Sequence, residues 1–371
     1  MRRLSDFTAR ALGRLALGRL ALALGIGAVG GALFAQLGVP LAWLIGAMCL
    51  TTASALAGAK IMVPAPLRWL MIAVLGTMVG SAFRPEMFER AGQWLVSLSG
   101  LLVYVAVVAV VISFYFRRVA RYDRATAYFS AIPGGLAEMI VVGGAMGGDD
   151  RTIALTHASR ILLVVLTIPI WFRWVEGYQP TPGGVGEAIA SIPAFDLVVL
   201  ALCAVVGFVG ARALRLPGAA LIGPLALSAA AHLTGLTESR PPSEIVVISQ
   251  VVIGASVGCR FAGVKARRVL SALLVAAGST ILMLGISVAS AVVLHAVAGL
   301  PVEALVLAYA PGGVAEMSLI ALALGIDPAF VSTHHVVRIV LVVVLAPAAF
   351  KLFVHVRERR ARAAEQEAKG D

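Results

Sequence analysis

Two glutamates in strongly apolar surroundings are the residues whose chemistry most needs a physical reason. Glu138 follows the triplet Pro133-Gly134-Gly135, and Glu316 follows Pro311-Gly312-Gly313. An ionisable side chain is costly inside a membrane, and a Pro-Gly-Gly triplet removes a backbone donor and weakens a helix. Because the combination occurs twice, we interpret both triplets and both glutamates as a paired binding site for a substrate or coupling ion. A packing kink is the alternative, since Gly and Pro are frequent in membrane helices.

A histidine and an arginine follow each motif on the next apolar segment. His157 and Arg160 are three residues apart, as are His335 and Arg338, so each pair shares one helix face. The four side chains are therefore candidates for substrate or ion binding. The histidines could in addition relay protons near neutral pH, although a satisfied polar contact is the commoner role of a lone histidine.

The glutamates and arginines have opposite charges and follow the same spacing in both copies. We predict that Glu138 lies near Arg160 and that Glu316 lies near Arg338, because an ion pair offsets the cost of burying charge in a membrane. Clamps between helices that only fix the fold are the alternative role for the arginines.

Three further polar residues are secondary candidates for the site. Gln250 lies in an apolar segment in which Ile72 is the equivalent residue of the first half, so Gln250 would be an asymmetric substrate contact. Asp149 and Asp327 precede the last segment of each half. We prefer helix N-capping for both aspartates and treat ion binding as second.

The composition identifies the class of protein. Of the 371 residues, 60% are hydrophobic and 13% are charged, and the mean hydropathy is +0.96, which indicates a polytopic membrane protein. The net charge of +11 lies in short loops and at both ends of the chain. This is the distribution that orients a membrane protein, so we expect membrane lipid and a small molecule or ion as partners, and no nucleic acid.

Metal-dependent chemistry has no sequence support. The three cysteines are isolated in apolar segments, and no His, Cys or carboxylate cluster has metal-ligand spacing. We therefore expect no metal, no cofactor, no catalytic residue and no enzyme activity. Spacings of small residues such as Gly27-x-x-x-Gly31 suit helix contacts within one chain or in a homo-oligomer.

Apolar segments of membrane-spanning length divide the chain into two similar halves of six segments each. Pro133 and Pro311 are 178 residues apart, and so are the two histidines and the two arginines. The predicted organisation is a basic cytoplasmic N-terminus (1–15), a first membrane repeat (16–175), a linker (176–195), a second membrane repeat (196–355) and a charged cytoplasmic tail (356–371).

The loop charges predict how the two repeats are oriented. Four arginines follow the fourth segment of the first half, whereas the basic cluster of the second half, from Arg260 to Arg268, follows its third segment. Twelve full crossings would put these two basic loops on opposite sides of the membrane. If each Pro-Gly-Gly segment is broken or re-entrant, five full crossings remain per half and both loops are cytoplasmic. We therefore predict an all-α fold of inverted repeats, with interrupted segments of the kind that hold substrates in secondary transporters.

The duplicated Pro-Gly-Gly-x-Ala-Glu-Met motif with its His-x-x-Arg helix resembles the AbrB-duplication membrane family of bacteria, which also carries an ammonia monooxygenase label. Both copies match, and the resemblance spans most of residues 16–355. It implies a fold related to cation/proton antiporters and anion transporters. Family members are also described as regulators of gene expression.

Three functions therefore compete. We predict a secondary transporter of the bacterial inner membrane, multi-pass with both termini cytoplasmic, in which the arginines favour a small carboxylate-type anion and the glutamates favour proton coupling. A membrane regulator or sensor that affects gene expression indirectly is the alternative. A monooxygenase is the least favoured, because the sequence offers no metal site.

Overall fold

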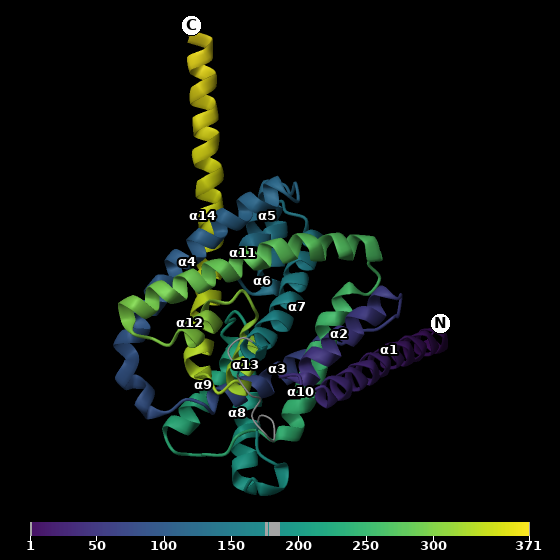
Figure 1. Ribbon diagram of the computed structural model, residues 1–371. Coiled ribbons are helices and arrows are strands. Elements are labelled where there is room, and N and C mark those ends of the chain that lie inside the picture. The colour runs from purple at the N-terminus through teal and green to yellow at the C-terminus, as the bar shows by residue number, and fades with distance from the viewer. Residues whose placement is uncertain (1, 175–176, 178–185, 371) are drawn as a thin grey trace.

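A computed structural model describes residues 2–174, 177 and 186–370 (Figure 1). Regular structure in these residues is helical, apart from an isolated bridge between Glu187 and Pro242. The helices of the first half are α1 (Arg2–Gln36), α2 (Ala42–Leu56), α3 (Ala65–Gly80), α4 (Ala91–Arg118), α5 (Arg124–Ala131), α6 (Leu136–Ala145) and α7 (Asp150–Trp174). Those of the second half are α8 (Ala194–Ala213), α9 (Ala219–Leu233), α10 (Ser243–Gly258), α11 (Ala266–Ala298), α12 (Val302–Tyr309), α13 (Val314–Ala323) and α14 (Pro328–Gly370).

Three short 3₁₀ helices, η1 (Pro85–Arg90), η2 (Ile189–Ser191) and η3 (Cys259–Phe261), complete the regular structure. The predicted linker 176–195 lies partly outside the described residues. The C-terminal part of α14 continues the helix through the predicted tail and projects away from the helical body (Figure 1).

Prolines set the starts of several helices. Pro64, Pro193, Pro242 and Pro301 each occupy the N-cap of the helix that follows. Proline holds φ near −65° and lacks the amide hydrogen that an N-terminal residue would leave unpaired, so it suits a helix start. Proline alone does not end a helix here, because α7, α9 and α14 continue through Pro169, Pro224 and Pro347, so the breaks in the fifth segments depend on the adjacent glycines as well.

The predicted break in each fifth segment is confirmed. α5 ends at Ala131 and α6 begins at Leu136, with Pro133-Gly134-Gly135 between them, and α12 and α13 are separated in the same way. Gly135 and Gly313 are the N-caps of α6 and α13 and have extended backbone. Each motif therefore ends one short helix and starts another, which leaves a new helix N-terminus inside the protein.

Both broken segments are re-entrant hairpins. The amide of Asp149, after α6, donates a hydrogen bond of 2.8 Å to the hydroxyl of Thr126 at the start of α5. In the second half, Pro301 and Asp327, which flank the α12–α13 segment, line one cavity. Because the start and the end of each segment lie together, each hairpin enters the helical body and returns on the side from which it came.

Long apolar helices with exposed apolar faces surround the hairpins. Within the described residues, seven helices are long and apolar enough to cross a membrane, which confirms a multi-pass membrane protein. Val110 on α4 and Ile281 on α11 are more than 70% exposed, as side chains facing lipid would be. α2, α3 and α9 have 15 or 16 residues, shorter than the roughly 20 residues expected of a full crossing.

Glycines bring the helices of the two halves into close contact. A Cβ atom on Gly76 of α3 would lie 2.6 Å from the carbonyl oxygen of Leu221 on α9, and one on Gly254 of α10 would collide with the carbonyl of Leu44 on α2. The third helix of each half therefore packs against the second helix of the other half. This exchange makes the two repeats one body.

Equivalent helices of the two halves run in opposite directions where they meet. Near the C-terminal end of α4, the Tyr115 hydroxyl donates to the carbonyl of Val275, in the first part of α11. In the middle of both helices, the hydroxyls of Tyr104 and Ser287 are 3.2 Å apart. Gly100, in the first part of α4, packs against Leu294, near the end of α11. α4 and α11 are thus an antiparallel pair.

Candidate functional site

The His-x-x-Arg pairs bind the backbone that the Pro-Gly-Gly breaks leave open. His157 Nε2 lies 2.9 Å from the carbonyl oxygen of Phe129, and His335 Nε2 lies 2.9 Å from that of Leu307. A carbonyl oxygen can only accept, so Nε2 carries the hydrogen in both rings. Both histidines therefore donate to the last turn of the first hairpin helix.

The arginines complete the same clamp. Arg338 donates to the carbonyls of Ala310 at 2.7 Å and Gly312 at 2.9 Å, while Arg160 donates to the carbonyl of Ser130 at 3.3 Å. In each pair an arginine Nη2 also donates to the histidine Nδ1 at 2.8 Å. An unpaired buried carbonyl costs about 1–3 kcal/mol, so these contacts stabilise the interrupted segments. The clamp interpretation of the arginines accounts for these contacts.

The predicted glutamate–arginine pairs are wrong. Among the described residues, Arg160 and Arg338 contact carbonyl oxygens and histidines rather than glutamates. Glu138 and Glu316 are in the first turn of α6 and α13, and their carboxylates lie against the N-cap glycines Gly135 and Gly313. The arginines bind carbonyls at the end of the first hairpin helix and in the Pro-Gly-Gly turn, where proline supplies no amide donor.

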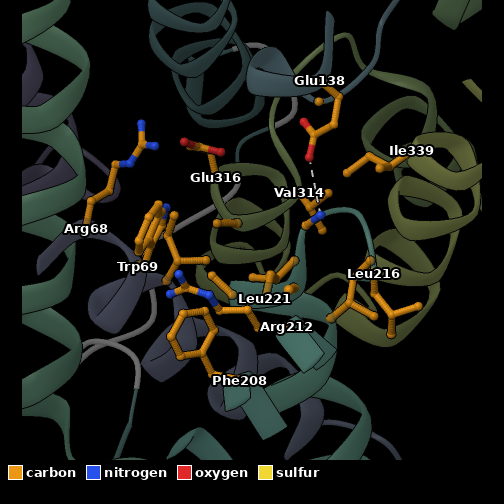
Figure 2. Close-up of a pocket in the computed structure, with 17 residues that line it drawn as sticks. Arg68, Trp69, Glu138, Phe208, Arg212, Leu216, Leu221, Val314, Glu316 and Ile339 are labelled. Carbon is orange, nitrogen blue, oxygen red and sulfur yellow. Dashed lines mark hydrogen bonds between the residues drawn. The ribbon is translucent and has the colours of Figure 1, made fainter. Parts of the chain in front are cut away.

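Both glutamates instead line one cavity of about 450 Å³ (Figure 2). We call it the glutamate cavity and define it by its charged and aromatic lining residues, Glu138, Glu316, Arg68, Arg212, Trp69 and Phe208. The N-terminal ends of α3, α6, α9 and α13, the C-terminal end of α8 and Ile339 of α14 form its wall. The glutamates of both motifs thus contribute to one cavity.

The two carboxylates have different partners inside the glutamate cavity. Glu138 Oε1 accepts a hydrogen bond of 3.3 Å from the amide of Gly218, the left-handed N-cap of α9 with φ 64° (Figure 2). The carboxylate of Glu316 interacts electrostatically with Arg260 and Arg68. The repeated glutamates thus face a helix N-terminus on one side and two arginines on the other.

Two arginines of the cavity were not identified as site residues from the sequence. Arg212 lies over the ring of Trp69 at 5.4 Å and over that of Phe208 at 6.0 Å, as a cation held by aromatic faces. Arg68 has a buried Nε with no hydrogen-bond partner among the described residues. A signal for Arg68 was present, since its counterpart 178 residues later is Val246 and a charge without a duplicate needs its own explanation.

The secondary candidates lie apart from the glutamate cavity. Asp149 accepts hydrogen bonds from the amides of Arg151 and Thr152, and Asp327 does the same for Ala329 and Phe330, so the N-cap interpretation is confirmed. Gln250 is buried on α10 and is not among the residues that line the cavity. The triplets contribute through their backbone, and Gly135 lines the cavity directly.

Comparison with known proteins identifies the family of this chain. Residues 43–354 match the protein family described as "Transition state regulatory protein AbrB". The chain is similar to the protein named "Uncharacterized protein YhjN" of Bacillus subtilis (strain 168), with 26% identity over 352 residues that cover 89% of this chain and 92% of that protein. The match covers both hairpins and most of the helices around them, and the chain belongs to the AbrB family.

Proposed function

We propose that this protein is a proton-coupled secondary transporter of a small carboxylate-type anion, and not an enzyme. The observation that carries the proposal is the glutamate cavity, in which two broken helices from different repeats present their N-termini and their glutamates to one space. Interrupted helices that meet at a shared site are the binding architecture of many secondary transporters.

The lining of the cavity favours an anion. Arg68 and Arg212 supply positive charge, and the N-termini of α6, α9 and α13 add the positive ends of three helix dipoles. The remaining wall is mainly aliphatic, including Ile72, Leu221 and Val314. A short organic carboxylate has the charge for the first group and the apolar body for the second.

Charge balance couples such an anion to a proton. When all four charged side chains that line the cavity are ionised, its formal charge is zero, and an entering carboxylate meets Glu138 and Glu316. At about 4 Å, repulsion by one carboxylate is roughly 4 kcal/mol at an effective dielectric constant of 20. Protonation of one glutamate removes that repulsion and leaves a net positive cavity. One proton would therefore accompany each monocarboxylate.

The proposed topology is an inverted repeat with the basic loops and both termini in the cytoplasm of a bacterial cell. The antiparallel pair of α4 and α11 supports it, because it brings the end of α4, with Arg117 and Arg118, toward the start of α11, with Arg267 and Arg268. Basic residues gather on the cytoplasmic side of inner-membrane proteins. In this orientation the glutamate cavity, which begins at the first turn of α3 and the end of α8, opens inward.

Uptake into liposomes tests the function. A panel of short mono- and dicarboxylates is offered to the reconstituted protein under an imposed proton gradient, and uptake of at least one compound should follow the gradient. Glu138→Gln and Glu316→Gln should each lose at least about tenfold of the proton-driven rate. Glu238→Gln, an exposed carboxylate outside the cavity, is the control and should transport normally. Normal uptake by both cavity variants would refute proton coupling.

Cysteine labelling tests the topology separately. In a background without Cys49, Cys203 and Cys259, single cysteines at Ala120 and Lys265 should both react with a membrane-impermeant reagent from the cytoplasmic side only. Labelling from opposite sides would exclude inverted repeats.

A further inference from the structure

A second cavity, of about 980 Å³, is strongly basic and separate from the glutamate cavity. Five cationic side chains line it, and we call it the basic cavity: Arg151, Arg260, Lys265, Arg267 and Arg268. Its other lining residues are apolar or small, among them Leu155, Val264 and Ser271, and none of the described residues that line it is a carboxylate. Like charges gathered in one concave space repel one another, so the arrangement favours a bound anion.

The inner end of the basic cavity contains an unsatisfied donor. The Nε of Arg260 is buried and has no hydrogen-bond partner in the part of the chain that the structure describes. Lys265, Arg267 and Arg268 are exposed at the mouth, and Asp149 interacts with Arg268 at the rim. Arg260 also interacts electrostatically with Glu316 of the glutamate cavity, so most of the uncompensated positive charge lies on the exposed cations of the basic cavity. The unpaired Nε of Arg260 adds a buried donor for an anionic group that enters the cavity.

The surface beside the mouth indicates where the anion comes from. Ser271 lines the cavity on α11, and the neighbouring Leu270 and Leu274 on the same helix are 60% and 67% exposed. In a membrane protein these leucines face acyl chains. A molecule with its anionic end in the basic cavity and its apolar end along α11 would satisfy both surfaces.

We propose that the basic cavity binds the phosphate headgroup of an anionic phospholipid from the adjoining leaflet. Basic pockets between transmembrane helices recognise such headgroups. Arg151 comes from α7 of the first repeat, and the other four cations come from η3, α11 and the loop between them in the second repeat. The headgroup therefore links the two repeats, and binding stabilises the contact between α7 and α11.

Binding of short-chain phosphatidylglycerol to the detergent-purified full chain tests the proposal, by native mass spectrometry and by the thermal unfolding midpoint. The wild type should bind the lipid and unfold at a higher temperature. Arg267→Gln combined with Arg268→Gln should weaken binding by about thirtyfold, as expected for two lost contacts to an anionic lipid. Arg151→Gln, which changes the opposite wall, should also weaken binding and guards against a folding defect of the double variant.

Two sets of controls show whether binding depends on the basic cavity and on the lipid part of the ligand. Arg117→Gln combined with Arg118→Gln removes the same charge from the nearby end of α4, outside the cavity, and should leave binding unchanged. Phosphatidylcholine, glycerol phosphate and inorganic phosphate should bind much more weakly than phosphatidylglycerol. Equal binding of glycerol phosphate would make a soluble phosphate the ligand and overturn the lipid proposal. Equal losses in the two double variants, or no loss in the cavity variants, would show only a basic surface and would also overturn it.

Discussion

Replacement of Arg338 by methionine should destabilise the protein more than the same replacement of Arg160. The two side chains are equivalent in the repeats and almost equally buried, at 2% and 3% exposure. Each also donates to its histidine at 2.8 Å. The loss of a buried charge and of that contact therefore largely cancels when the two variants are compared.

The backbone carbonyls account for the remaining difference. Arg338→Met leaves the carbonyls of Ala310 and Gly312 without the donors that now lie at 2.7 and 2.9 Å. Arg160→Met leaves the carbonyl of Ser130, whose present bond of 3.3 Å is longer and weaker. At about 1–3 kcal/mol for each buried carbonyl left unpaired, Arg338→Met should cost about 2 kcal/mol more than Arg160→Met.

Unfolding in mixed micelles, followed by tryptophan fluorescence against rising SDS, measures the two free energies under one condition. Lysine at position 338 should recover part of the loss, because an ammonium group can still reach one carbonyl. Equal losses in the two methionine variants, or a larger loss at Arg160, would refute the assignment of the arginines as carbonyl clamps. The glutamates would then need to be reconsidered as their partners.

Two further predictions concern the helices that support the site. Asp149→Ala and Asp327→Ala should each cost about 1 kcal/mol as lost N-caps, measured by the same unfolding assay. Burial alone would raise the pKa of Asp149, but hydrogen bonds from Thr152 and Arg151 lower it below its ordinary value. The Asp149 cap should therefore stabilise the protein fully above the unfolded pKa of about 4, and this stabilisation should be lost as the pH falls through the lower folded pKa. A pH-independent difference in unfolding free energy between wild type and Asp149→Ala would contradict this. Gly46→Ala puts a Cβ onto the backbone of Gly30 and should lower the free energy of unfolding by about 1–3 kcal/mol or more. Gly285→Ala on α11, with open space around it, is the control and should be neutral or slightly stabilising. Equal effects of the two variants would exclude close packing of α1 against α2.

The sequence predicted those features that follow from local chemistry. Proline and two glycines cannot continue a helix, so the breaks before Leu136 and Val314 were accessible from residue types alone, as were the caps at Asp149 and Asp327. The partner of each arginine was not accessible. Helical spacing puts His335 and Arg338 on one face, but it does not show that the carbonyls of the preceding hairpin lie closer to that face than any carboxylate does.

The position of Arg68 and Arg212 in the sequence explains why they were not predicted as site residues. Arg68 and Arg212 lie near helix ends, where a basic residue usually sets orientation, and only the tertiary fold brings both to the glutamates. Neither arginine has a duplicate in the other half, but composition and loop charge do not show that such a residue lines a cavity. Both predicted glutamates line the cavity, and its two arginines are additions that only the fold provides.

The acidic and basic residues of the glutamate cavity differ in whether the duplication repeats them. The glutamates are duplicated, so both halves contribute the same acidic group at the start of the same short helix. The cations are not duplicated, because Val246 is the counterpart of Arg68 and Ala35 is that of Arg212, 177 residues earlier. If the repeats exchange conformations during transport, the protonatable groups remain available in both states, while the arginines belong to one end of the path. Proton coupling would then depend on the symmetric residues and anion recognition on the asymmetric ones, so Arg68→Gln should raise the substrate KM at the inward end more than it changes proton dependence.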